Sequence, residues 1–162
     1  MPEIIIGIDP GYADAGYGVI SAGGGREKCL AYGSIRTPAG APAGDRLKTL
    51  YGRLKEIIVR FKPRRAAIEK LYFSTNVKTA LSVAEARGVI LLCLEDLGVP
   101  CREFGPGEVK VAVSGHGGAA KSQVQKMTKT LLGLKEIPKP DDAADALALA
   151  LTLANTRKFD KL

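Results

Sequence analysis

The sequence predicts an α/β fold in which a mixed five-stranded sheet is flanked by helices. Residues 4–8 are mostly isoleucine, which is typical of a strand buried on both faces. Two further strand patterns follow, joined by glycines at positions 23–25 that suit a hairpin turn. From residue 45 onward, helical and short strand patterns alternate. Antiparallel strands followed by alternating helices and strands describe a mixed sheet with helices on its faces.

The composition suits one domain that spans residues 1–162. Of the 162 residues, 46% are hydrophobic and 25% are charged, which allows a sizeable core. The net charge of +7 favours a polyanionic partner. The three cysteines lack metal-finger spacing and indicate reduced thiols, and no apolar run approaches the roughly 20 residues of a membrane helix. We therefore expect a cytoplasmic protein without a membrane partner.

The N-terminal half is expected to hold most of the strands. After the opening strand, residues 17–21 and 28–35 have strand patterns. Proline and glycine make residues 37–44 a loop. Apolar side chains at helical spacing predict an amphipathic helix over residues 45–61, and residues 65–69 (RAAIE) are typical of a short buried strand.

The C-terminal half is expected to be mainly helical. A long helix begins at Asn76, a preferred N-cap residue, and runs to about residue 97. A strand over residues 99–104 and a helix over residues 105–113 come next. A glycine-rich loop and a basic helix then end near residue 132. The alanine- and leucine-rich residues 142–156 predict a last helix that packs against the sheet.

Two acids directly follow buried strands. Asp9 ends the first strand, before Pro10 and Gly11, and Glu69 ends the strand over residues 65–69. In sheets covered by helices, ligands bind at the carboxyl ends of strands, which suits metal or phosphate chemistry. Asp-Pro-Gly is also an ordinary turn sequence, so turn formation is the alternative role for Asp9.

Three aspartates open the last helix: Asp141, Asp142 and Asp145. Acids in a first helical turn satisfy free backbone N–H groups and complement the helix dipole, so capping is the simplest explanation. Capping explains Asp145 less well, because its charge lies one turn inside an apolar helix. Asp145 shares a helix face with Asp142 and also with Asp141, so the spacing alone does not choose between these two.

Together, the strand-end acids and the helix acids predict a metal site. Crowded carboxylates repel one another and stay ionised at neutral pH only with a cation among them. Their hard oxygen atoms select Mg²⁺ or Mn²⁺. Two such ions can activate water and stabilise the leaving oxygen in phosphodiester hydrolysis. A metal-dependent nuclease is the function that this pattern favours.

Six short strings also occur in a fixed order along nearly the whole chain. They are GIDPG (7–11), GYG (16–18), AIE (67–69), ARG (86–88), GHGGAAKSQVQ (115–125) and DAADALALA (142–150). In this order they resemble the RuvC-type Holliday junction resolvases, within the ribonuclease H-like superfamily. The resemblance implies a Mg²⁺-dependent crossover junction endodeoxyribonuclease, with Mn²⁺ as a substitute. Such an enzyme resolves four-way junction DNA by paired symmetric nicks in recombination and repair, with branch-migration proteins as further partners.

The resemblance also implies roles for individual residues. It implies four metal ligands that are also the catalytic acids: Asp9, Glu69, Asp142 and Asp145. The family string favours Asp142 over Asp141, which leaves Asp141 as the helix cap. Some family members have histidine at the third acidic position, where this chain keeps aspartate. His116, the only histidine, lies in the glycine-rich loop and is expected to shape that loop or contact DNA.

Basic and aromatic residues near these acids are candidate DNA contacts. Lysines beside the glycine-rich loop are ordinarily a solvated helix face. The resemblance instead implies that Lys110 and Lys121 lie near the scissile phosphate, with Lys121 assisting catalysis. Tyr72 and Phe73 follow Glu69 closely. Such an aromatic pair ordinarily packs in the hydrophobic core, and the alternative is that it stacks on unpaired bases at a junction centre. Which of the two aromatic residues meets DNA stays open.

A homodimer is expected because two symmetric nicks need two symmetric active sites. The helix expected over residues 76–97 has apolar side chains around more of its circumference than one buried face needs, which favours it as the interface. The alternative is a helix wholly enclosed in the core of one monomer.

Three other functions compete with this hypothesis. An actin-like or sugar-kinase ATPase also has an acid and glycines after a first strand, but it needs a second lobe that 162 residues do not provide. A non-catalytic DNA-binding module would be hindered by four acids that repel phosphate. The third is a nuclease of the same superfamily that acts on RNA, and only a panel of substrates distinguishes it from a junction resolvase.

Overall fold

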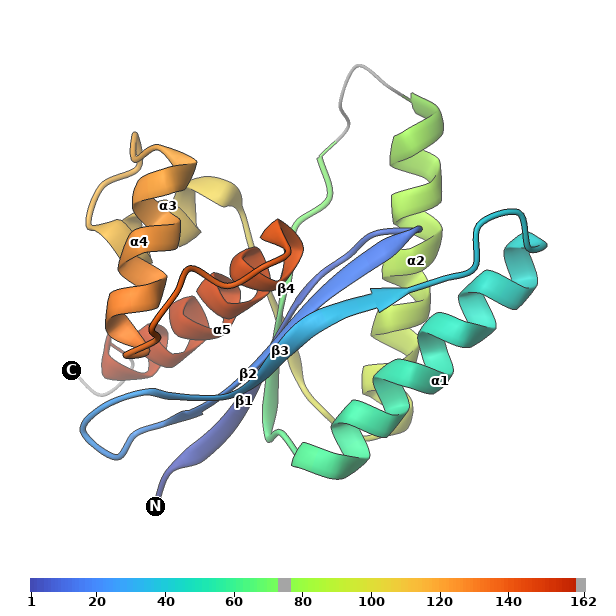
Figure 1. The fold of residues 1–162 in the computed structure, drawn as a ribbon. Coiled ribbons are helices and arrows are strands. Elements are labelled where there is room, and N and C mark those ends of the chain that lie inside the picture. Colours follow the sequence, from blue (N-terminus) through green and yellow to red (C-terminus); the bar gives the residue numbers. More distant parts are fainter. Residues whose placement is uncertain (73–76, 160–162) are drawn as a thin grey trace.

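The computed structural model describes residues 1–72 and 77–159, and its five strands form one sheet (Figure 1). The strands are β1 (Glu3–Asp9), β2 (Asp14–Ala22), β3 (Lys28–Arg36), β4 (Arg65–Glu69) and β5 (Cys101–Phe104), in the spatial order β3-β2-β1-β4-β5. β1, β2 and β3 are paired antiparallel. β1, β4 and β5 are paired parallel. The predicted mixed five-stranded sheet is confirmed.

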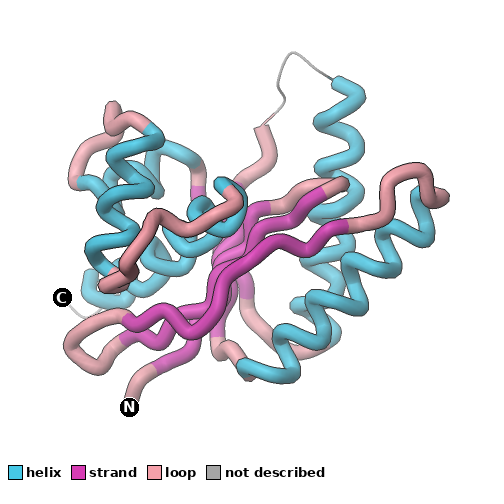
Figure 2. Tube along the Cα trace, in the orientation of Figure 1, coloured by secondary structure: helices cyan, strands magenta, loops and turns pink. Residues whose placement is uncertain are grey.

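Helices cover both faces of this sheet (Figures 1 and 2). They are α1 (Ala43–Phe61), α2 (Val77–Asp96), α3 (Pro106–Ser114), α4 (Lys121–Leu131) and α5 (Asp141–Phe159). α1 and α2 pack together on one face, whereas α5, with α3 and α4 beside it, covers the other. The described residues include no helix that is both long and apolar enough to cross a membrane.

The β1 strand is buried on both faces, as its isoleucines predicted. Ile6 and Ile8 are fully buried in the core that the sheet shares with α1 and α2. Ile5 points to the other face and is fully buried among residues of α5. Because successive side chains of a strand alternate between faces, one isoleucine run supplies both cores.

α5 lies unusually close to the sheet, because glycines of β1 and β2 face it. A Cβ atom on Gly7 would lie 1.9 Å from the carbonyl oxygen of Ala146, and one on Gly16 would lie 2.0 Å from that of Asp142. Small residues on both surfaces therefore bring the backbone of α5 almost onto the strands. This contact sets the first turn of α5 beside the end of β1.

Several predicted boundaries differ from the observed ones by a few residues. β2 begins at Asp14 rather than at residue 17, because its pairing with β3 continues to Asp14 and Arg36. β5 begins only at Cys101, since Pro100 has no N–H group for the ladder. α5 begins at Asp141, one residue earlier than predicted. The predicted N-cap residue Asn76 lies outside the described residues.

Candidate metal and nuclease site

Asp9 and Glu69 come together because β1 and β4 are parallel neighbours. Gly7 pairs with Ala67 and Ile8 with Ile68, so the next residues along each strand are Asp9 and Glu69. Both acids therefore lie at the carboxyl ends of these parallel strands, and their side chains share a hydrogen bond. The strand ends meet here as the sequence predicted.

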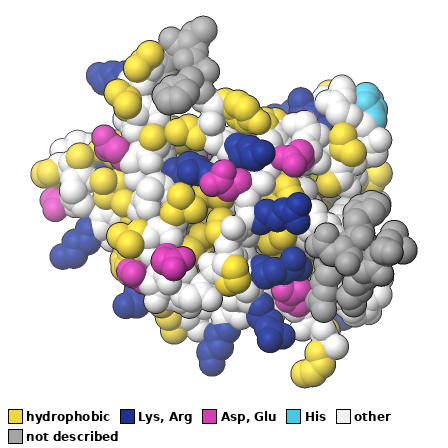
Figure 3. Space-filling view, turned by 180° about the vertical axis from the view of Figure 1, so that it is seen from behind, with side chains coloured by type: hydrophobic (Ala, Val, Ile, Leu, Met, Phe, Trp, Pro, Cys, Tyr) yellow, Lys and Arg dark blue, Asp and Glu magenta, His cyan; other side chains and the backbone are white. Residues whose placement is uncertain are grey.

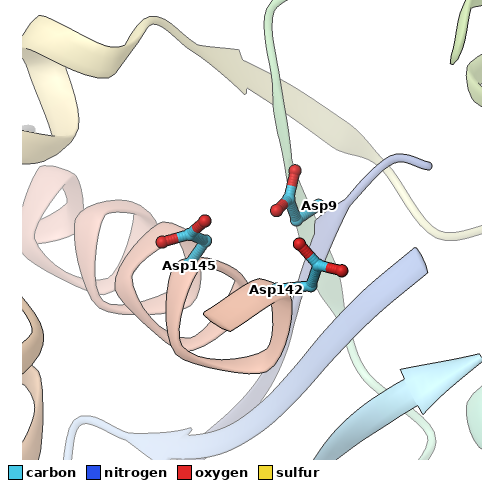
Figure 4. Close-up of side chains that lie close together, drawn as sticks. All are labelled: Asp9, Asp142 and Asp145. Carbon is cyan, nitrogen blue, oxygen red and sulfur yellow. The ribbon is translucent and has the colours of Figure 1, made fainter. Parts of the chain in front are cut away.

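Asp142 and Asp145 join this pair from the first turns of α5 (Figure 4). Carboxylate oxygens of Asp9, Asp142 and Asp145 lie within 4.8 Å of one another, and all three residues are partly buried. The three side chains approach one another from β1 and α5 in Figure 4. These oxygens are hard ligands close enough to share one ion, so the donor set fits a divalent metal. Glu69 is not part of this group of three but lies beside Asp9, and we call Asp9, Glu69, Asp142 and Asp145 the acidic cluster.

Burial and mutual repulsion raise the pKa values of the acidic cluster. Burial raises the pKa of Asp9 to about 9, and the charges of Glu69, Asp145 and Asp142 add to the effect. Burial also raises the pKa of the other three carboxyl groups. A cation among these groups would reverse the balance by favouring their ionised forms. The electrostatics of the cluster thus match those of a metal site.

Lys121, the first residue of α4, contacts the edge of the acidic cluster. Its Nζ lies 3.6 Å from Oδ2 of Asp145 and 3.4 Å from Oδ2 of Asp141. The expectation that Asp141 caps α5 is wrong: the carbonyl of Pro140 accepts the first helical hydrogen bonds, from Ala143 and Ala144. The Asp141 carboxylate instead contacts α4.

A cavity of about 260 Å³ opens beside the acidic cluster. Its polar lining combines two acids with two lysines, namely Glu69, Asp145, Lys110 and Lys121. Its apolar wall comes from α3, α4 and α5, namely Pro106, Val109, Val124, Ala148 and Leu149. The structure thus brings both predicted lysines to the same cavity as the acids. The apolar wall had no sequence signal, because these side chains follow ordinary helical periodicity.

The other predicted DNA contacts are distributed differently. Tyr72 is 60% exposed. It lines a second cavity, of about 290 Å³, and Glu69 lines this cavity as well as the first. Phe73 lies outside the described residues. His116 is exposed, and its Nδ1 accepts a hydrogen bond from the amide of Gly118 at 3.0 Å. His116 lines neither of these two cavities and shapes its own loop.

Arg87, from the string ARG, has a contact that the sequence alone did not reveal. Its guanidinium forms an ion pair with Glu103 on β5, and its side chain is only 16% exposed. It also lines the second cavity, beside Tyr72. The pair joins α2 to the edge of the sheet, and a contact between residues so far apart in the chain has no local sequence pattern.

Without metal, the folded protein is expected to lose stability as the pH rises from about 4 to about 9. Folded Asp9 keeps its proton up to a pKa of about 9, whereas the ordinary value is 3.8. The folded state therefore binds more protons than the unfolded state in this range, so a rising pH favours unfolding. Melting temperatures between pH 5 and pH 8 test this. Asp9→Asn should flatten the slope, and an equal slope in both proteins would contradict the explanation.

Known proteins resemble this chain over nearly its full length. The family model described as "Crossover junction endodeoxyribonuclease RuvC" matches residues 5–153. The RuvC of Brevibacillus brevis is 50% identical over 155 residues, which cover 96% of this chain and 93% of that protein. The RuvC of Moorella thermoacetica is 51% identical over 152 residues, covering 94% of this chain and 91% of that protein.

A solved structure has the same fold. The structure described as "T. thermophilus RuvC in complex with Holliday junction substrate" superposes with a TM-score of 0.92 at 37% identity, covering 98% of this chain and 96% of that chain. The ribonuclease H-like fold implied by the resemblance is confirmed. This chain belongs to the RuvC family of crossover junction endodeoxyribonucleases.

Proposed function

We propose that this protein resolves four-way DNA junctions by hydrolysing phosphodiester bonds with bound Mg²⁺, for which Mn²⁺ substitutes. The observation that carries the proposal is the approach of Asp9, Asp142 and Asp145 to within 4.8 Å in a member of this family. The junction bound to the Thermus thermophilus relative supports the choice of substrate.

The acidic cluster would hold the metal in this reaction. When bound, the divalent ions supply an activated water and stabilise the leaving oxygen. The chain's own lysines would act on the DNA: Lys110 and Lys121 line the cavity beside the acids, where they can hold the phosphate. Tyr72, exposed on the second cavity, is free to stack on an unpaired base. We also propose Phe73 and His116 as DNA contacts.

The surface charge supports binding to nucleic acid. Lys and Arg side chains form a row down the middle of the face seen from behind (Figure 3). The chain carries 24 Lys and Arg against 17 Asp and Glu. Cations in such a row can follow a phosphate backbone and steer the DNA toward the enzyme.

A panel of substrates tests the proposal. A synthetic four-way junction, a linear duplex and an RNA–DNA hybrid are each incubated with Mg²⁺, Mn²⁺ or Ca²⁺. We expect symmetric nicks in the junction alone, with Mg²⁺ or Mn²⁺ present. Cleavage of the hybrid would favour an RNA nuclease, and binding without cleavage under all conditions would favour a DNA-binding module.

We also propose that the protein acts as a homodimer through α2. Three exposed apolar side chains of this helix are separated by helical spacings: Val77, Leu81 and Leu92. Gly88, which lies between them along the helix, has open space where a Cβ atom would be. The alternative of a helix wholly enclosed in the monomer does not agree with these exposures. A second copy would cover them and pair the two active sites.

Leu81→Glu and Leu92→Glu are expected to give folded monomers. Each side chain is 56% exposed, so the fold should tolerate the change, whereas two charges facing each other across an isologous interface should separate the copies. Light scattering at micromolar concentration measures the mass, and a cruciform plasmid distinguishes paired nicks from single ones. Leu30→Glu, at a 45% exposed position of β3, is the matched control and should stay dimeric. An unchanged mass for both α2 variants would overturn this interface.

A further inference from the structure

Asp141 uses both of its carboxylate oxygens to contact α4, although its side chain is 69% exposed. Its Oδ2 lies 3.4 Å from Nζ of Lys121. Its Oδ1 accepts a hydrogen bond of 3.3 Å from Nε2 of Gln125. A carboxylate that only complemented the helix dipole would need neither partner.

The two partners belong to one face of α4. Lys121 and Gln125 are four residues apart, so their side chains lie on the same helix face, one turn from each other. The start of α4 is itself fixed, because Oε1 of Gln123 accepts a hydrogen bond of 2.9 Å from the amide of Ala120. The first two turns of α4 thus contact the first residue of α5 from a defined position.

Lys121 has two carboxylates within reach, and they differ in what they can do during the reaction. Asp145, at 3.6 Å, belongs to the acidic cluster and would give its charge to a metal ion. Both oxygens of Asp141 instead contact α4, through Lys121 and Gln125, and neither belongs to the group of oxygens within 4.8 Å of one another. The Asp141 charge therefore stays available to the Lys121 ammonium group when Asp145 binds a metal ion.

We propose that Asp141 is a positioning residue that acts through Lys121. It holds the Lys121 ammonium at the cavity beside the acidic cluster, and Gln125 orients the Asp141 carboxylate for this task. The proposal rests on the proposed function and extends it to a residue outside the four acids. Without Asp141, the flexible lysine side chain would keep its charge but lose its fixed place near the phosphate.

A double-mutant cycle tests whether Asp141 acts through Lys121. Single-turnover cleavage of a four-way junction is measured at saturating enzyme for the wild type, Asp141→Asn, Lys121→Ala and the double variant. Asp141→Asn should slow cleavage about tenfold, because a misplaced catalytic group loses much of its effect. The double variant should be no slower than Lys121→Ala alone. Full additivity of the two losses, or an unchanged rate in either single variant, would overturn the proposal.

Two measurements separate positioning from other roles. Junction affinity without divalent metal should be unchanged in Asp141→Asn, and calorimetry without DNA should give metal affinity within about threefold of the wild type, as expected for a charge outside the ligand set. A large loss of metal affinity would make Asp141 a ligand and overturn the proposal. Asp141→Glu should recover part of the cleavage rate, because it restores the charge.

Asp14→Asn is the matched control for the loss of one negative charge. Asp14 acts electrostatically on Asp142, but its carboxylate contacts Arg36 and Ser34. It should change cleavage much less than Asp141→Asn. If both variants slowed cleavage equally, Asp141 would act only through a non-specific electrostatic effect, and the proposal would be overturned. A wild-type protein that leaves junctions uncut would instead overturn the proposed function itself.

Discussion

Asp9→Asn is expected to reduce junction cleavage by about 10³-fold or more while junction binding survives. Asp9 lies at the centre of the acidic cluster, where its carboxylate oxygen is within 4.8 Å of those of Asp142 and Asp145. Metal assistance supplies several kcal/mol of stabilisation to the transition state, and about 4 kcal/mol corresponds to that factor. Binding depends mainly on cations that contact phosphates, which this change leaves in place. Single-turnover cleavage and junction titration without divalent metal measure the two effects separately.

The substitution should not disturb the fold. With a pKa of about 9, Asp9 is protonated at neutral pH when metal is absent, so the neutral amide of asparagine resembles its metal-free state. Metal-free Asp9→Asn at pH 7 should therefore unfold at a temperature no lower than that of the wild type, because asparagine is neutral without taking up a proton on folding. Asp14→Asn is the control for cleavage, because Asp14 lies outside the ligand group. Near-normal cleavage by folded Asp9→Asn would remove the acidic cluster from the mechanism.

The sheet and the acidic cluster were predictable because both depend on local patterns. The isoleucine run of β1 specifies a strand buried on two faces, and β4 repeats the arrangement of a buried strand that ends in an acid. Since parallel strands expose their carboxyl ends at one edge, Asp9 and Glu69 had to be neighbours once β1 and β4 were paired. Helix spacing added Asp145 with either Asp141 or Asp142 from the last helix, and the resemblance selected Asp142.

The position of Asp141 was not predictable, because its partners come from another helix. Sequence spacing placed Asp141 in the first turn of a helix, where capping is the usual role of an acid. The contact with Lys121 and Gln125 depends on how α4 lies against α5, and no local pattern records that packing. Contacts of this kind become visible only when the helices are placed in space.

The role of the glycines was likewise hidden in the sequence. Gly7 and Gly16 belong to strings that carry the family resemblance, and a glycine near a strand end also suggests a turn or a phosphate loop. The structure gives them a different role, since each meets the backbone of α5 at a distance that no Cβ atom tolerates. The reason for a glycine in β2 lies in a helix more than a hundred residues later.

Gly16→Ala is expected to destabilise the protein by about 3 kcal/mol, near the upper end for overpacking in a core. A Cβ atom at this position would lie 2.0 Å from the carbonyl oxygen of Asp142 and 2.8 Å from its Cβ. Both atoms are fixed by α5, so the helix itself must move away from β2. Because the displaced turn carries Asp142, the same change should weaken metal binding.

Gly52→Ala provides the matched control with the opposite sign. Gly52 lies within α1 and has open space where a Cβ atom would be. Alanine there should raise stability by about 0.5–1 kcal/mol, because it lowers the entropy of the unfolded chain. Urea unfolding without metal measures both free energies, and calorimetry measures metal affinity, which only Gly16→Ala should lower. If Gly16→Ala were as stable as the wild type and bound metal normally, the close approach of α5 to β2 would not be what positions the acidic cluster.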